Sequence, residues 1–113
     1  MDRFLKLLFF AYTLLIFFLS IYPVKEMPSD DKLVHFLVFF LFTVVMKLSF
    51  NIGYWSTFFY GSLYGLFIEA VQYFLPYRSG EYGDFLADCF GVLSGLFTYF
   101  LFEFLYMELK YKE

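Results

Sequence analysis

Four long apolar runs are separated by short polar segments along the chain. The runs cover residues 4–22, 33–50, 52–75 and 84–106. Each is close to the ~20 residues that a helix needs to cross a bilayer. Their apolar residues follow one another continuously and do not alternate with polar ones, which favours helices over the strands of a β-barrel. The pattern therefore predicts an all-α membrane protein with four transmembrane helices.

The polar segments between the runs predict three short connections, at residues 23–30, 51–53 and 76–83. Successive helices joined in this way are expected to pack as an antiparallel bundle, with residues 1–113 forming one domain. The first run follows Arg3 and Lys6, as in a signal peptide, but no small-x-small cleavage motif stands near its end. We therefore expect a retained helix.

Composition supports a membrane protein and removes several alternatives. The chain is 62% hydrophobic and 17% charged, whereas a soluble domain is about 45–50% apolar and about 25% charged. A single cysteine, Cys89, excludes an intrachain disulfide scaffold. The formal net charge of -3 gives no reason to expect nucleic acid as a partner.

The basic residues predict the orientation of the helices. Five of them lie toward the N-terminus, the second connection and the C-terminus: Arg3, Lys6, Lys47, Lys110 and Lys112. Three lie on the opposite side: Lys25, Lys32 and Arg78. Because basic residues are enriched on the cytoplasmic side, we expect both termini in the cytoplasm. Lys47, Lys110 and Lys112 are then interpreted as interfacial anchors.

Polar residues inside the runs are expected to meet near the outer surface. His35 lies in the first turn of the second helix, Glu69 and Gln72 near the end of the third, and Asp84 and Asp88 at the start of the fourth. Antiparallel packing places all five at one depth. Ionisable groups within a membrane are costly and usually face the bundle interior, so they indicate a functional site.

Helical spacing aligns these residues with glycines. Two stripes result: Gly61, Gly65, Glu69 and Gln72, and Asp84, Asp88, Gly91 and Gly95. Steps of three and four residues keep each set on one helix face. Small-xxx-small spacing permits close helix packing, which is a sufficient explanation for the glycines alone.

Structural roles are the alternative for the polar residues. Glu69 could pair with Arg78 or Lys32 at the helix ends, and Asp84 could stabilise the positive end of a helix. For Asp84 alone the structural role is the better explanation. For Glu69 and Asp88, which lie about one turn inside apolar spans, a functional role is favoured.

The ordered polar residues resemble the VanZ-like family of small membrane proteins. The motifs are Asp31-Lys32-x-x-His35-Phe36-x-x-Phe39, then Gly65-x-x-x-Glu69-x-x-Gln72 with Arg78, then Asp84-x-x-Ala87-Asp88-x-x-Gly91-x-x-x-Gly95. One position departs from the family pattern, since members commonly carry Asn where this chain has Asp88. The resemblance implies a polytopic protein of the bacterial inner membrane, some of whose relatives confer resistance to the glycopeptide antibiotic teicoplanin.

Two functions are compatible with these residues. In the first, a polar pocket that opens outward binds a membrane lipid, a lipid-linked cell-wall component or an amphiphilic antibiotic. The binding residues would be Asp31, Lys32, Gln72, Arg78 and Asp84. Lys32 and Arg78 would hold a phosphate or carboxylate.

In the second, the chain is a membrane-embedded hydrolase or transferase for a lipid or phosphoester. Its catalytic residues would be His35, Glu69 and Asp88, with His35 as general acid or base. Asp84 and Asp88 would be the pair for a hard metal ion, although the sequence identifies no metal or cofactor. Ion passage is least favoured because the inner halves of the helices offer only Lys47 and Glu103. A self-contained bundle and a homo-oligomer both remain open.

Overall fold

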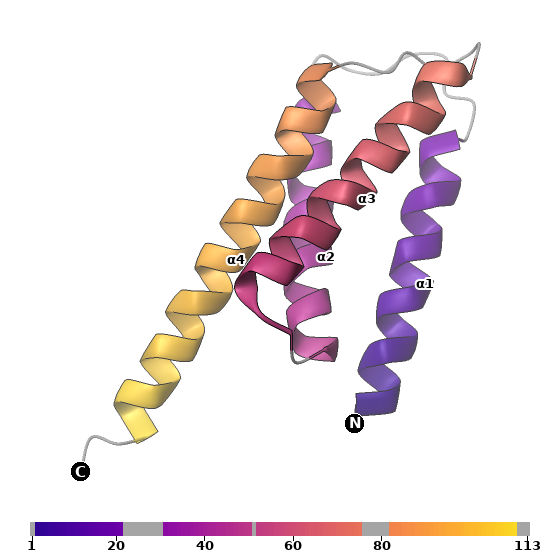
Figure 1. Cartoon of the computed structure of the whole chain (residues 1–113). Helices are drawn as coiled ribbons and strands as arrows, with labels where there is room; N and C mark the ends of the chain where they lie inside the picture. The colour runs from indigo at the N-terminus through magenta and orange to yellow at the C-terminus, as the bar shows by residue number, and fades with distance from the viewer. Residues whose placement is uncertain (1, 22–30, 51, 76–81, 111–113) are drawn as a thin grey trace.

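The computed structural model describes residues 2–21, 31–50, 52–75 and 82–110. Within them the secondary structure is four α-helices (Figure 1): α1 (Asp2–Ile21), α2 (Asp31–Ser49), α3 (Tyr54–Phe74) and α4 (Tyr82–Lys110). The prediction of an all-α chain with four helices is confirmed. The largest difference from the predicted bounds is at the end of α4, which runs to Lys110, four residues beyond the predicted end.

Three of the helices are long and apolar enough to cross a membrane: Arg3–Ile21, Lys32–Ser49 and Gly83–Lys110. The helix α3 has 21 residues, which is sufficient length for a span. Its sequence, however, contains serine, threonine, glycine, Glu69 and Gln72, and five of its residues are tyrosine or tryptophan. These residues lower its hydropathy, so a membrane span for α3 stays a prediction.

Close contact between α2 and α4 forms the centre of the fold. A Cβ atom at Gly91 of α4 would collide with the main-chain oxygen of Phe36 and would lie 3.0 Å from the amide nitrogen of Phe40. A Cβ atom at Gly95 would lie 2.8 Å from the carbonyl oxygen of Phe40. Because these neighbours are backbone atoms that cannot move aside easily, glycine is required for the two helices to approach this closely.

The helix α3 packs against α4 at the other glycine stripe. A Cβ atom at Gly61 would lie 2.9 Å from Val92, and one at Gly65 would lie 3.0 Å from Asp88. Both glycine stripes that the sequence predicted are therefore helix contacts. They fix how α2, α3 and α4 are placed relative to one another, and with them the polar residues on the same faces.

The helix α1 lies beside α2 and α3 and has no contact with α4 among the described residues. Side-chain hydrogen bonds to main-chain oxygens connect it to its neighbours. The Tyr12 hydroxyl donates to the carbonyl of Val38 over 3.0 Å, and the Tyr64 hydroxyl donates to the carbonyl of Thr13 over 2.6 Å. Because the tyrosine hydroxyls are satisfied internally, they can lie within an apolar environment.

The buried core is narrow, and most large apolar side chains face outward. Its residues are Ile16, Phe39, Phe42, Met46, Ile68, Val92 and Leu96. Large hydrophobic residues are exposed on all four helices, including Phe18 at 60%, Leu37 at 54% and Phe97 at 62%. A soluble monomer rarely presents so much contiguous apolar surface. This surface is what lipid contact requires.

Candidate functional site

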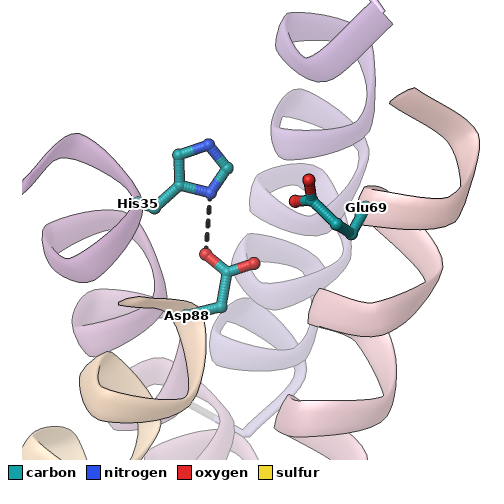
Figure 2. A group of neighbouring side chains, drawn as sticks. All are labelled: His35, Glu69 and Asp88. Carbon is teal, nitrogen blue, oxygen red and sulfur yellow. Dashed lines mark hydrogen bonds and ion pairs between the residues drawn. The ribbon is translucent and has the colours of Figure 1, made fainter. Parts of the chain in front are cut away.

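Three helices bring one ionisable side chain each to the same place. His35 extends from α2, Glu69 from α3 and Asp88 from α4, and their polar ends face one another (Figure 2). One donor atom from each residue lies within 4.8 Å of the others. Glu69 is 8% exposed and Asp88 is fully buried. The structure thus brings together the three residues that the sequence nominated as catalytic.

The shortest contact in this group joins His35 and Asp88. The Nδ1 atom of His35 lies 2.8 Å from Oδ1 of Asp88. Since a carboxylate oxygen accepts hydrogen bonds, we assign a proton to Nδ1. The Nε2 atom on the other side of the ring lies 3.8 Å from Oδ2 of Asp84. The imidazole therefore lies between two carboxylates, and the hydrogen bond to Asp88 orients the ring.

Local helix geometry explains why both aspartates reach the histidine. Asp84 and Asp88 are one turn apart on α4, so they share the face that meets α2. Gly91, less than one turn further along, allows α2 to approach that face. Opposite Asp88, Gly65 leaves space for the carboxylate, since a Cβ atom there would lie 3.1 Å from Oδ2 of Asp88.

Lys32 adds a positive charge at the edge of the site. Its Nζ atom lies 3.8 Å from Oδ1 of Asp84, and its side chain is 55% exposed whereas that of Asp84 is 3% exposed. The lysine stem runs close to Gly83, where a Cβ atom would lie 2.6 Å from Cε of Lys32. We call the five residues Lys32, His35, Glu69, Asp84 and Asp88 the His35 site.

The remaining residues nominated from the sequence lie elsewhere or outside the described residues. Gln72 is 2% exposed and donates from Nε2 to the carbonyl of Ser20 over 3.1 Å, which connects α3 to α1. Its assignment as a binding residue stays a prediction. Asp31 begins α2, but its side chain lies outside the described part of the structure. Arg78 lies in the segment 76–81, also outside it.

Ser20 also contributes at this end of the molecule. It takes part through its main-chain oxygen, while its hydroxyl donates to the carbonyl of Ile16 over 2.7 Å. No side-chain motif reports a main-chain acceptor, so the sequence carried no signal for it. The contact places the end of α1 next to α3 near the His35 site.

Two kinds of chemistry fit this arrangement. A histidine oriented by a buried carboxylate is the usual arrangement of a general acid or base. An imidazole with two carboxylates from different elements is also a donor set that divalent metal ions accept. The first depends on His35 and Asp88, and the second on His35, Glu69 and Asp88 together.

Comparisons with known proteins identify a relative and a family. An uncharacterized protein of Schizosaccharomyces pombe is 32% identical to the chain over 91 residues, which are 76% of this chain and 56% of that protein. The chain therefore spans little more than half the length of this relative. No solved structure matches the chain.

Residues 4–103 match the VanZ/LLP1 family, a range that contains every residue of the His35 site. The resemblance to VanZ-like proteins inferred from the three motifs is thereby confirmed. The chain belongs to the VanZ/LLP1 family of proteins.

Proposed function

We propose that this chain is a multi-pass membrane protein of the cell envelope whose His35 site binds or modifies the polar headgroup of a lipid or of a lipid-linked cell-wall component. The observation that carries the proposal is the meeting of His35, Glu69 and Asp88 at one end of helices that are otherwise apolar on the outside. Charged groups are buried in such helices only where a specific interaction compensates the cost.

The orientation that we propose is an antiparallel bundle in a bacterial inner membrane, with both termini in the cytoplasm. In Figure 1 the start of α1 and the end of α4 lie at the same end of the molecule, while the start of α2 and the end of α3 lie at the other. With the basic residues favouring cytoplasmic termini, the His35 site lies at the outer leaflet. A headgroup there is accessible from the membrane and from the outer aqueous phase.

A lipid headgroup is favoured over a cell-wall precursor as the ligand. The relative from Schizosaccharomyces pombe supports this choice, because yeast membranes share phospholipids with bacteria but contain no peptidoglycan precursors. Lys32, which is more than half exposed, supplies a cation at the edge of the site for a phosphate. In our proposal Arg78 supplies a second one from the neighbouring connection.

A second candidate is catalysis on the same headgroup, as a hydrolase or transferase. The 2.8 Å contact between Nδ1 of His35 and Asp88 supports it, because the carboxylate holds the imidazole in one tautomer. Nε2 would then take a proton from water or from a lipid hydroxyl that attacks the phosphoester, and would return it to the leaving oxygen. Glu69 would hold the attacking group or serve as an alternative base.

Lipid analysis of cells separates the two candidates. Cells that express the wild-type chain, His35→Ala or Glu103→Gln at equal protein level are compared with cells lacking it, by mass spectrometry of extracted lipids and of lipid retained by the purified protein. Catalysis predicts a changed lipid species that His35→Ala abolishes, by at least about 100-fold if acid–base catalysis is lost. Binding alone predicts an unchanged lipid profile but a lipid that is retained by wild type and lost from His35→Ala.

Glu103→Gln is the matched control, since it removes a carboxylate far from the His35 site. An unchanged lipid profile together with no retained lipid would contradict both candidates. A role in resistance to teicoplanin is tested by measuring teicoplanin sensitivity in these strains and in one that expresses Arg78→Ala. Expression of the wild-type chain should shift the sensitivity, and Arg78→Ala should remove the shift.

A further inference from the structure

We infer that His35, Glu69 and Asp88 form a binding site for one divalent transition-metal ion of the Zn²⁺ or Mn²⁺ type. The inference concerns the site itself and does not depend on a lipid being the ligand. It assigns a role to all three side chains at once, whereas a histidine–aspartate pair leaves Glu69 as an accessory.

The distances fit a shared ion. Bonds of about 2.0–2.2 Å from metal to nitrogen or oxygen place two ligand atoms of one ion about 3–4.3 Å apart. In this chain one nitrogen and two carboxylate oxygens lie within 4.8 Å of one another. The longest of these separations therefore exceeds the range for a shared ion by at most about 0.5 Å.

The partner of the other imidazole nitrogen is a second, independent observation. A histidine that binds a metal usually donates its other ring N–H toward a carboxylate, which fixes the ring and strengthens the bond to the metal. An ion at Nδ1 of His35 would replace the proton assigned there, and the proton would then lie on Nε2, which is 3.8 Å from Oδ2 of Asp84. Asp84 is itself paired with Lys32. A carboxylate therefore lies on the side of the ring where it could support a bound ion, although 3.8 Å is longer than a hydrogen bond.

Electrostatics favours a cation at this position. Glu69 and Asp88 are both at least nine-tenths buried, and a carboxylate oxygen of one is within 4.8 Å of one from the other. Like charges this close repel strongly in a medium of low dielectric constant. A metal ion between them turns the repulsion into attraction. Protonation of His35 without a metal is the competing way to supply the positive charge, and the experiment below separates them.

The three helices hold the ligands in advance of binding. Each ligand comes from a different helix, and the helices are in contact at Gly65 and Gly91 next to the site. The chelating geometry therefore follows from the packing and does not require a loop to fold around the ion, which lowers the entropic cost of binding.

Zinc retention by the purified full-length chain tests the inference. The protein is purified in detergent with a tag that contains no histidine, since His35 is the single histidine of the chain. It is stripped with a chelator, incubated with Zn²⁺, desalted and assayed for zinc. We expect about one ion per chain and a melting temperature that rises by several degrees with Zn²⁺, because an ion that binds the folded state stabilises it.

Three variants locate the ion. Glu69→Gln and Asp88→Asn keep the side-chain shape and should weaken zinc binding by at least about tenfold, as loss of a ligand or its support does. His35→Ala should abolish binding, while Glu103→Gln should retain it. Circular dichroism establishes that each variant is folded.

Cobalt gives an answer that does not depend on variants. Co²⁺ bound by one nitrogen and several oxygens in a site of low coordination number shows visible absorption, which should appear on titration of the stripped wild-type protein and disappear on addition of Zn²⁺. A wild-type protein that retains no zinc and shows no cobalt spectrum would overturn the inference and leave the protonated histidine as the source of positive charge. Equal zinc retention by His35→Ala would overturn it too.

Discussion

The two ends of the helix assembly bury charged groups in different ways. At the end opposite the His35 site, Lys47 of α2 is only 8% exposed. Its Nζ atom donates to the carbonyl of Ile52 over 2.7 Å, and it lies 4.2 Å from the ring centre of Tyr54 and 5.1 Å from that of Tyr99. The sequence predicted an interfacial anchor here; the structure shows a buried ammonium group that neighbouring residues enclose.

The difference between the ends separates structural from functional burial of charge. Around Lys47 the compensation is local, since one carbonyl oxygen and two aromatic faces stabilise one cation. At the His35 site several ionisable groups of both signs gather from three helices. Helix packing alone does not explain this arrangement, because each additional buried charge adds its own desolvation cost. Convergence, more than burial, distinguishes a candidate site.

Substitution of Gly91 should have the largest effect of those that test this contrast. In Gly91→Ala the added Cβ atom would collide with the main-chain oxygen of Phe36, so α2 and α4 must separate. We expect a loss of about 2 kcal/mol or more in the free energy of unfolding, in the upper range for overpacking. Denaturant titration of the protein in detergent, followed by circular dichroism, measures it.

The matched control for this prediction is Gly53→Ala, since nothing lies within 4 Å of a Cβ atom at Gly53. It should cost at most about 1 kcal/mol, because Gly53 is the N-cap residue of α3 and alanine is less favourable there. Gly91→Ala should also weaken zinc retention, because separation of α2 from α4 moves His35 away from Asp88. Equal stability of the two alanine variants would contradict the close approach of the helices.

Removal of the Lys47 charge should have an intermediate effect on stability and none on the His35 site. Lys47→Met keeps the apolar stem but loses the hydrogen bond to Ile52 and the interaction with the rings of Tyr54 and Tyr99. We expect a net loss of about 1–2 kcal/mol, because the desolvation cost of the buried charge disappears together with the hydrogen bond and the cation–π contacts. Zinc retention and lipid retention should match wild type. A loss of either would show that the two ends are coupled.

The smallest effect is expected for the hydroxyl of Tyr54. This group donates to Oε1 of Glu103 over 2.8 Å at an exposed position. Tyr54→Phe removes that bond but keeps the ring beside Lys47, so the free energy of unfolding should fall by at most about 0.5 kcal/mol. The same denaturant titration measures it. A loss as large as that of Lys47→Met would mean that the hydrogen bond between Tyr54 and Glu103 contributes as much to stability as the contacts of Lys47.

Most of the architecture was predictable because it depends on local patterns. Continuous apolar runs of about 20 residues predict helices directly, and the four observed helices follow them. Spacing of three and four residues also placed Gly65 beside Glu69 and Gly91 beside Asp88 on shared faces. The partner of the α3 glycines was harder to predict, since their spacing marks a packing face but does not identify α4 as the helix that it meets.

The partners of individual polar side chains were not predictable in the same way. Gln72 was grouped with the site because it shares a helical stripe with Glu69, yet it donates to the main chain of Ser20. Lys47 was interpreted from its place near a helix end, yet the start of α3 and Tyr99 of α4 surround it. Both outcomes depend on where a neighbouring helix lies, which helical periodicity alone does not contain.

The sequence by itself determined that the chain forms apolar helices with His35, Glu69 and Asp88 near corresponding helix ends, because hydropathy and periodicity are properties of consecutive residues. Only the tertiary structure decided that Nδ1 of His35 meets Asp88 at 2.8 Å while Nε2 faces Asp84. These distances depend on the rotation and separation of α2 and α4, which Gly91 and Gly95 set through backbone contact. Helix packing therefore converts a set of nominated residues into a site with defined geometry.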